Sequence, residues 1–342
     1  MYNKVNYHVN WGDNMIYIRN DDHRPQFNLA LEQYVFDNLD QFDEIFMLWI
    51  NEPTIVVGKN QNTIEEINLD FVRKNNINVV RRLSGGGAVY HDFGNLNYTI
   101  ISKSQKSTAF NFEAFTKPII EVLAKLGVKA EFTGRNDLTI DGKKFCGNAQ
   151  YVKKGKVLHH GAILFNTDLE VLSKALKVPK DKIESKGVKS VRSRVTNIKD
   201  HLKEDITIED FKQLLLEHMK ENSEDFQEYK LTEEDYEKIN KLMEERYATW
   251  EWNFGISPEF NIEKAERFKT GKVQTKIHVD NGIIKGIKIY GDFFGSGEIA
   301  DVENKLIGIK YKEDEIEKVL DSIDIGYYFT GISKEEIMRC LI

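Results

Sequence analysis

Apolar and polar positions alternate in short runs over the first half of the chain, and this pattern predicts a sheet with a few helices. Between Tyr17 and about Asn197, runs of apolar residues are separated by short turns, among them the Asp-Gly dipeptide at 141–142. Strands that follow one another through such turns indicate a mixed, largely antiparallel sheet rather than a doubly wound parallel one. The predicted strands cover 44–50, 54–59, 77–83, 95–101, 137–145, 146–152 and 156–166, and the predicted helices cover 27–39 and 116–127.

The pattern changes to helical spacing from about Ile208, where Thr207 and Thr232 each precede acidic residues as helix N-caps do. The segment 250–260 interrupts the helices with two tryptophans, a glycine and a proline. Beyond it, 272–291 reads as a hairpin turning at Asn-Gly, and two amphipathic helices follow. We therefore predict an α+β protein with three parts. They are a catalytic domain over 1–249, a linker over 250–259, and a small α+β domain over 260–342. The size of the last is marginal for an independent core, so we expect it to dock on the first.

Composition excludes several classes of protein. The chain has 342 residues, of which 41% are hydrophobic and 30% are charged, with a net charge of −7. An acidic balance argues against a general nucleic-acid binder. The two cysteines, Cys146 and Cys340, are too far apart for a zinc motif and too few for a disulfide framework. The N-terminus has no apolar signal core, and no window approaches ~18 continuous apolar residues. We expect a cytoplasmic enzyme without a membrane segment.

The stretch RRLSGGGAVYHD, residues 81–92, places three glycines directly after a predicted strand and two arginines. A wide loop or a bulged strand explains such a run. An anion or a nucleotide lying against the backbone explains it equally well, with Arg81 or Arg82 meeting the charge. The chain contains neither a GxxxxGKS/T loop nor a GxGxxG sequence. A nucleotide would therefore be held by loop backbone and scattered polar side chains.

The hairpin DLTIDGKKFCGNAQ, residues 137–150, carries a second group of candidates. Strand alternation predicts that Lys144 and Cys146 share one face and that Lys143 and Phe145 share the other. With Asn136 and Asp137 at the start of the hairpin, Lys144 could hold phosphates and a divalent ion. The alternative is that Lys144 is a solvated strand lysine.

Two adjacent histidines and one basic run leave further alternatives. His159 and His160 should point to opposite faces of their strand, so at most one belongs to a given site. Cys146 with His160 could form a nucleophile and base, which is the minority interpretation. The basic run 189–199 could contact phosphate, or it could be a solvated loop that covers the site.

Several motifs occur together in a fixed order, and jointly they are far more specific than SGGG alone. They are RPQFNLALEQ (24–33), RRLSGGGAVYHDFGN (81–95), GRNDLTIDGKKFCGNAQ (134–150), HHGAILFNTDL (159–169), KGVKSVRSRVTNI (186–198) and WEWNFG (250–255). On these residues the chain resembles the lipoate–protein ligases of the large bacterial type, in the biotin/lipoate ligase superfamily. The resemblance implies a mixed-sheet catalytic domain related to biotin ligases and class II synthetases, with a small α+β accessory domain.

This resemblance implies a two-step reaction. ATP and lipoic acid give lipoyl-AMP and pyrophosphate, with Mg²⁺ as the metal. The lipoyl group then passes to a lysine of a lipoyl domain and AMP leaves. The implied acceptors are the acyltransferase subunits of 2-oxoacid dehydrogenases and the H protein of glycine cleavage. We expect a monomer that binds neither nucleic acid nor membrane.

The resemblance also assigns residues position by position. Lys144 matches the family lysine that touches the carboxylate and the α-phosphate, and is the expected catalytic residue. Asp137 is the expected metal ligand. The expected ATP-binding set is Arg82, Gly87, Ala88, Val89, Tyr90, Asn136, Asp137 and Lys144. The expected lipoate-binding set is Lys144, Arg82, Ser84, Gly86, His91 and Trp49, with Trp49 as an apolar wall.

Three other functions compete with this one. Cys146 stands where several relatives have serine, and octanoyl and lipoyl transferases of the superfamily work through a cysteine, so an ATP-independent transferase using Cys146 is the main alternative. The C-terminal domain, which the transferases generally lack, favours the ligase, and we interpret Cys146 as structural. A non-catalytic lipoate binder would not need Lys144, Asn136, Asp137 and Arg82 together. A biotin ligase would carry a Gly/Arg-rich loop that is absent here.

Overall fold

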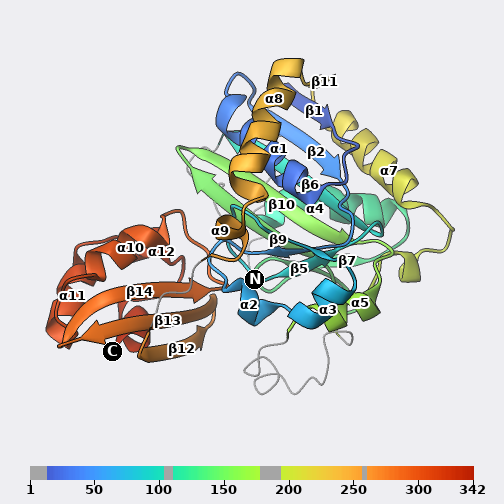
Figure 1. Cartoon of the computed structure of the whole chain (residues 1–342). Coiled ribbons are helices and arrows are strands. Elements are labelled where there is room, and N and C mark those ends of the chain that lie inside the picture. The colour runs from blue at the N-terminus through green and yellow to red at the C-terminus, as the bar shows by residue number, and fades with distance from the viewer. Residues whose placement is uncertain (1–13, 104–110, 178–193, 256–259) are drawn as a thin grey trace, which may run out of the picture.

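A computed structural model describes residues 14–103, 111–177, 194–255 and 260–342. Figure 1 shows a larger body built around a central sheet and a smaller C-terminal body beside it. No helix within these ranges is long and apolar enough to cross a membrane.

The larger body is built on an eight-stranded mixed sheet, as the sequence predicts. Strand β1 pairs in parallel with β2 and β11, and every other neighbouring pair is antiparallel. The order is β11-β1-β2-β6-β10-β9-β8-β7. The strands are β1 (Asn14–Arg19), β2 (Glu44–Trp49), β6 (Asn95–Lys103), β7 (Ala130–Thr133), β8 (Asp137–Ile140), β9 (Lys143–Lys153), β10 (Lys156–Leu164) and β11 (Asp225–Glu228).

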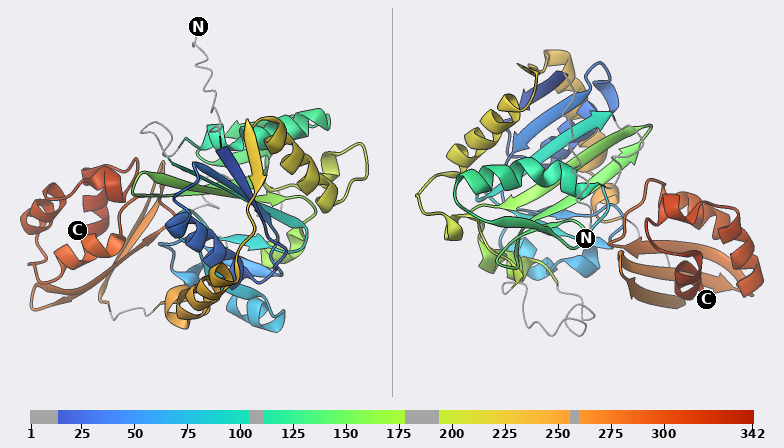
Figure 2. Two further views of the ribbon diagram at one scale, coloured as in Figure 1. Left: turned by 90° about the horizontal axis from the view of Figure 1, so that it is seen from above. Right: turned by 180° about the vertical axis from the view of Figure 1, so that it is seen from behind.

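Helices cover both faces of this sheet, which explains the near-continuous burial of its central strands (Figure 2). Along β2, Phe46 and Leu48 join the core beneath α4 and α7, whereas Ile45 and Met47 join the core beneath α1 and α8. The helices are α1 (Pro25–Asn38), α4 (Phe112–Lys125), α7 (Ile208–Glu221) and α8 (Glu233–Leu242), the last continuing into the π-helical turn η3 (Met243–Tyr247). Thr207 and Thr232 form capping boxes at α7 and α8, which confirms both predicted starts.

A smaller sheet of order β4-β3-β5 carries the triple-glycine loop. Its strands are β3 (Thr54–Val57), β4 (Asn78–Arg81) and β5 (Val89–His91), so the loop lies between β4 and β5. The domain also has short helices: α2 (Thr63–Glu66), α3 (Leu69–Lys74), α5 (Leu169–Ala175), η2 (Lys199–His201) and α9 (Trp250–Asn253). Helix α9 lies in the range that we predicted as linker, and it packs on β4. There Asn253 Oδ1 accepts from Arg81 N at 2.9 Å and Trp252 Nε1 donates to Arg81 O at 2.9 Å.

The C-terminal domain is the small α+β unit that the sequence predicts. Strands β12 (Ile262–Phe268), β13 (Gly271–Asp280) and β14 (Ile283–Gly291) form an antiparallel sheet, and Asn281 and Gly282 make the predicted turn with φ values of 49° and 75°. Its helices are α10 (Ile299–Leu306), α11 (Glu313–Asp321), α12 (Ile325–Tyr328) and α13 (Lys334–Leu341). They bury a separate hydrophobic core against the sheet.

The two domains meet through polar contacts around α2 and through one aromatic side chain. Lys276 pairs with Glu65 at 2.6 Å, and Gly291 N donates to Asn60 O at 2.7 Å. Phe294, which follows β14, is buried in a cluster with Phe112 and Ala149 of the first domain. The C-terminal domain is therefore docked directly beside the triple-glycine loop, as its small core leads one to expect.

Candidate active site

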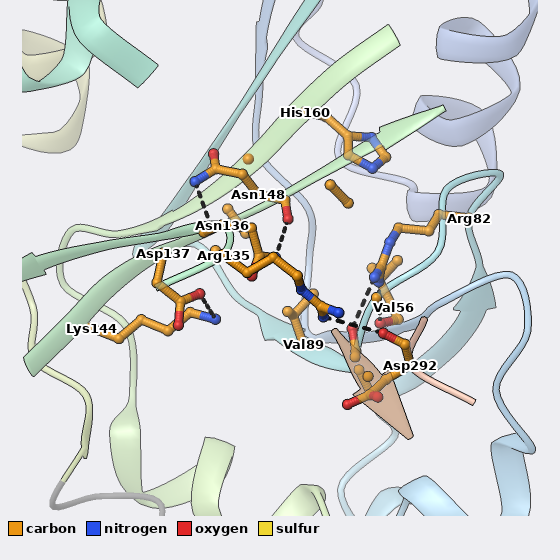
Figure 3. A pocket seen from close by; sticks show the side chains of 18 of the residues that line it. Val56, Arg82, Val89, Arg135, Asn136, Asp137, Lys144, Asn148, His160 and Asp292 are labelled. Atoms are coloured by element: carbon orange, nitrogen blue, oxygen red, sulfur yellow. Dashed lines mark hydrogen bonds and ion pairs between the residues drawn. The ribbon is translucent and has the colours of Figure 1, made fainter. Parts of the chain in front are cut away.

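A cavity of about 440 Å³ opens between the two sheets of the first domain and the edge of the C-terminal domain (Figure 3). This volume is in the usual range for small-molecule sites. Of the residues that the sequence assigned to the site, those that line the cavity are Trp49, Arg82, Gly86, Gly87, Ala88, Val89, His91, Asn136, Asp137 and Lys144.

Arg82 organises the triple-glycine loop. Its guanidinium donates to the carbonyl oxygens of Gly85 at 2.6 Å, Gly87 at 2.9 Å and Val56 at 3.2 Å, and its Nε donates to Ser84 Oγ at 3.0 Å. These four bonds leave one of its five N–H groups, on Nη1, for a ligand. Burial lowers the pKa of Arg82 to about 10, so it stays charged at neutral pH. The neighbouring Arg81 instead holds structural carbonyls, among them Gly58 O at 2.8 Å.

The three glycines have different neighbours. A Cβ on Gly85 would lie 2.4 Å from the carbonyl oxygen of Phe293, and a Cβ on Gly86 would lie 3.2 Å from the ring of Phe294. A Cβ on Gly87 would meet nothing within 4 Å. Because Gly85 and Gly86 have no side chain, the C-terminal domain can pack closely against them. The sequence did not predict this contact. Gly87 faces the cavity.

Lys144 points into the cavity from β9, where its Nζ lies 2.7 Å from Asp137 Oδ1 on β8. The prediction that Lys144 shares a face with Cys146 is wrong. Cys146 pairs with Leu138 and Lys144 pairs with Thr139, so Phe145 is an extra residue in a β-bulge. The bulge breaks the alternation of side chains. Lys144 therefore lies on the same face as Gly147, whose added Cβ would be 2.7 Å from Lys144 Nζ.

Cys146 is fully buried and lies in the same hydrophobic core as Phe145. It is not among the residues that line the cavity. Burial raises the pKa of the thiol far above its ordinary value, which keeps it protonated and poorly nucleophilic. The geometry therefore agrees with a structural cysteine.

Asn148, which the sequence analysis did not select, is held rigidly at the cavity wall. Its Oδ1 accepts from the Tyr98 hydroxyl at 2.5 Å, and its Nδ2 donates to Asn136 O at 3.0 Å. In return, Asn136 Nδ2 donates to Asn148 O at 2.5 Å. The amide of Asn136 is thus used to fix the turn that carries Arg135 and Asp137, and the turn is preorganised before any ligand binds.

The two histidines of β10 face opposite sides of the sheet, as predicted. His159 is buried, stacks on Phe115 at 4.8 Å and contacts Tyr98 at 2.9 Å. Burial keeps the pKa of His159 well below its ordinary value, so the ring is neutral. His160 lines the cavity, and its Nδ1 lies 3.0 Å from Glu32 Oε1.

Ser84 and Tyr90 do not line the cavity although the sequence assigned both to the site. Ser84 is buried and donates to His160 Nε2 at 2.6 Å while accepting from Arg82. It therefore positions two side chains that do line the cavity. The side chain of Tyr90 is buried in the core beneath the small sheet with Ile55, outside the cavity lining. The predicted basic run 189–199 falls partly outside the described residues.

Two buried nitrogen atoms at the Trp49 end of the cavity lack partners within the described ranges. They are His91 Nε2 and Asn97 Nδ2. Asn51 donates to His91 Nδ1 at 3.1 Å, which places the proton of the neutral ring on Nε2. Burial lowers the pKa of His91 to about 3. Both atoms are therefore donors beside an aromatic wall, and their desolvation cost is recovered only when a polar ligand atom accepts from them.

The C-terminal domain supplies part of the cavity wall, which sequence reasoning missed. Arg267, Phe268, Lys269, Gly271 and Asp292 all line it. From the first domain, Arg135 reaches across to this wall, donates to Asp292 O at 3.2 Å and stacks on the ring of Phe294 at 4.4 Å. Five cationic and two anionic side chains line the cavity. The site is therefore strongly positive in a chain whose net charge is −7, and it suits an anionic ligand.

The donor set agrees with Mg²⁺ of the kind that accompanies phosphates. Asp137 is the only carboxylate that the first domain contributes to the described cavity lining. Among the described residues there is no group of three or more His, Cys, Asp or Glu that could enclose a metal ion. Mg²⁺ bound to phosphates typically uses one or two protein carboxylates, keeps several waters and needs no such cage.

Comparison with known families matches both parts of the chain. Residues 24–220 match the family "Lipoyl protein ligase A/B catalytic domain", and residues 257–341 match "Bacterial lipoate protein ligase C-terminus". Lipoate-protein ligase LplJ of Bacillus subtilis is 46% identical over 95% of this chain and 99% of its own length. Lipoate–protein ligase 1 of Staphylococcus aureus is 46% identical over 93% of this chain and 96% of its own length.

Solved structures of lipoate ligases resemble this chain over most of its length. Plasmodium falciparum LipL1 in complex with lipoate superposes with a TM-score of 0.76 at 25% identity, covering 91% of this chain and 94% of that one. A lipoate-protein ligase A bound with ATP gives a TM-score of 0.60 at 29% identity, covering 71% of this chain and 99% of that one. The archaeal bipartite ligase of Thermoplasma acidophilum, solved as part of a lipoylation system with its E2 lipoyl domain, gives 0.62 at 31% identity, covering 73% and 98%.

Proposed function

This chain belongs to the lipoate–protein ligase family, and on that premise we propose that it activates lipoic acid with ATP and transfers the lipoyl group to a protein lysine. In the first step a carboxylate oxygen of lipoic acid attacks the α-phosphorus of ATP. The bond between the α-phosphorus and the bridging oxygen breaks, and pyrophosphate leaves. In the second step the amine of the acceptor lysine attacks the acyl carbon of lipoyl-AMP, loses a proton, and AMP leaves.

The observation that carries this proposal is the position of Lys144. Its ammonium lies inside the cavity and is held toward Asp137 on the neighbouring strand at 2.7 Å. A lysine placed there offsets negative charge as the carboxylate approaches the phosphate, and again as the mixed anhydride is opened. The relatives solved with lipoate and with ATP support the choice of these two substrates.

The two ends of the cavity suit the two ends of the intermediate. Trp49, His91 and Asn97 provide an aromatic wall with buried donors, and we assign the lipoyl group to this end. Gly87, Ala88 and Val89 would present backbone to the nucleotide, and Arg82 lines the same cavity. Asp137 would hold Mg²⁺, which when bound neutralises charge on the phosphates.

We assign lipoyl domains as the acceptors, including those of 2-oxoacid dehydrogenase acyltransferase subunits, and the H protein of glycine cleavage. The archaeal relative solved with its E2 lipoyl domain supports this class of acceptor. The transferase alternative would need a reactive thiol, whereas Cys146 is buried outside the cavity. A cytoplasmic location and a monomeric state stay predictions from the sequence.

The direct test is lipoylation of a purified acceptor lipoyl domain, followed by intact-protein mass spectrometry. We expect the mass of one lipoyl group to appear on the acceptor lysine only when lipoic acid, Mg²⁺ and ATP are all present. Transfer from a lipoylated or octanoylated carrier protein without ATP would instead identify a transferase.

A further inference from the structure

The turn between β12 and β13 brings cationic side chains of the C-terminal domain to the cavity. Arg267 pairs with Lys272 and Phe268 with Gly271, so Lys269 and Thr270 form the tip of this hairpin. Arg267, Phe268 and Lys269 all line the same cavity as Lys144. A domain that served only as a cover would not need cationic side chains at this point.

This turn is held firmly from both sides. Thr270 Oγ1 donates to Gly331 O at 3.0 Å, which ties the tip to the body of its own domain. The Asp292 carboxylate accepts from Lys272 N at 2.5 Å and pairs with Arg267 at 3.4 Å. Phe268 between them is buried. The cationic groups are therefore presented by a preorganised hairpin rather than by a free loop.

Charges of the same sign converge where this turn meets the first domain. Arg135 donates to Asp292 O through Nη2, while its Nη1 is buried without a partner among the described residues. Arg267 approaches the same residue, because its Nη1 lies 3.4 Å from the Asp292 carboxylate. The guanidinium groups of Arg135 and Arg267 and the exposed Lys269 therefore line one space. Among the described residues that line this space, Asp292 is the only carboxylate from the C-terminal domain. A ligand with several negative charges would relieve this repulsion.

We propose that Arg267 and Lys269, together with Arg135, bind the β- and γ-phosphates of ATP and the pyrophosphate that leaves. This inference rests on the proposed function, because it assigns one part of its first step. Lys144 and Asp137 lie at one side of the cavity and Asp292 at the other, with Arg135 between them (Figure 3). The α-phosphate belongs at Lys144, so the rest of the triphosphate extends toward the C-terminal domain.

A consequence is that Arg267 and Lys269 act in the first step and not in the second. Charge builds up on the leaving pyrophosphate as its bond to the α-phosphorus breaks, and fixed cations stabilise that charge. Lipoyl-AMP carries no β- or γ-phosphate. Transfer of the lipoyl group from lipoyl-AMP to the acceptor should therefore be independent of Arg267 and Lys269.

The test uses the full chain with Lys269→Ala, Arg267→Gln and the double variant. Lys285→Ala is the matched control, because Lys285 is an exposed lysine near the opposite end of the same sheet and does not line the cavity. Three rates are measured for each protein. Two of them are the rate of lipoate-dependent pyrophosphate release and the same rate with inorganic pyrophosphate added, which together give the inhibition. The third is the rate of transfer from supplied lipoyl-AMP to a lipoyl domain.

We expect the rate of pyrophosphate release by the double variant to be lower by about tenfold or more, because charge-assisted hydrogen bonds to the phosphates are lost. For the same reason, added pyrophosphate should inhibit the double variant less than it inhibits wild type. Transfer from lipoyl-AMP and the Lys285→Ala control should match wild type. Unchanged inhibition by pyrophosphate, or equal losses in both half-reactions, would overturn the inference. Lys269→Ala alone changes only an exposed side chain, so it guards against a folding defect in Arg267→Gln. A wild-type chain that makes no lipoyl-AMP would contradict the proposed function instead.

Discussion

Lys144 Nζ and Asp137 Oδ1 lie 2.7 Å apart across the β8–β9 hairpin, and a single bulged residue creates this pairing. Because Phe145 has no partner in register, Lys144 turns away from the core and toward the carboxylate. Both side chains keep about a third of their surface exposed, with a relative side-chain exposure of 36% each. The pair is therefore open to a ligand, which can replace Asp137 as the partner of the ammonium.

Replacing Lys144 with alanine should remove lipoyl-AMP formation while leaving the fold intact. The loss of a charge placed against the reacting groups is expected to lower the rate about 100-fold or more. The measurement is the rate of lipoyl-AMP accumulation, with circular dichroism as the check on folding. Lys143→Ala is the control, because Lys143 is exposed on the same strand. Equal rates for the two variants would contradict the assignment.

Gly147→Ala tests the position of Lys144 without removing its charge. The new Cβ would lie 2.7 Å from Lys144 Nζ, so the flexible end of the lysine must move. We expect little change in the melting temperature but a rate of lipoyl-AMP formation lower by up to about 100-fold, since small displacements of a catalytic group are costly. Gly286→Ala is the control, because its Cβ would meet only His278 Cβ at 3.9 Å. Full activity of Gly147→Ala would show that Lys144 need not occupy its present position.

Cys146→Ala should retain the ligase reaction. The thiol is fully buried in the core, so its removal is expected to lower the free energy of unfolding by about 1 kcal/mol. Activity at a temperature well below the midpoint of unfolding should stay close to that of wild type. An inactive but folded variant would revive the cysteine-dependent transferase. Native protein should also resist alkylation at this position, because burial raises the pKa of the thiol.

His91 should make stability depend on pH. Burial lowers its pKa in the folded state to about 3, whereas the unfolded chain titrates near its ordinary value of 6.5. Between these values the unfolded state binds a proton that the folded state does not, so stability falls as the pH falls. From about pH 7.5 to about pH 5.5 this group should cost about 1.4 kcal/mol.

The measurement for His91 is urea unfolding of wild type and His91→Asn at both pH values. Wild type should lose about 1.4 kcal/mol more than the variant over this interval, since the other titrating groups are common to both. Equal losses in the two proteins would mean that His91 is protonated in the folded state, and that its Nε2 hydrogen is not set by Asn51.

Local sequence patterns were sufficient to predict most elements of the fold. The capping boxes at Thr207 and Thr232 and the Asn281-Gly282 turn are local signals, and each appears where the pattern placed it. The family motifs likewise bring Lys144, Asp137 and Arg82 to one cavity.

Features that depend on contacts distant in sequence were not predictable. The bulge at Phe145 reverses the expected face of Lys144, and nothing in the residue pattern announces it. The cavity wall formed by Arg267 and Lys269 depends on how two domains dock, and Gly85 is required by that docking. In the sequence Asn148 is an ordinary strand residue. Its role becomes clear only from the hydrogen bonds that its side chain makes with Tyr98 and Asn136.

Activation of lipoic acid by this protein is best tested by pyrophosphate release from Mg²⁺-ATP by wild type in the absence of any acceptor protein. We expect release that requires lipoic acid, persists in Cys146→Ala and fails in Lys144→Ala. No release by wild type, together with acyl transfer between carrier proteins that depends on Cys146, would contradict this expectation.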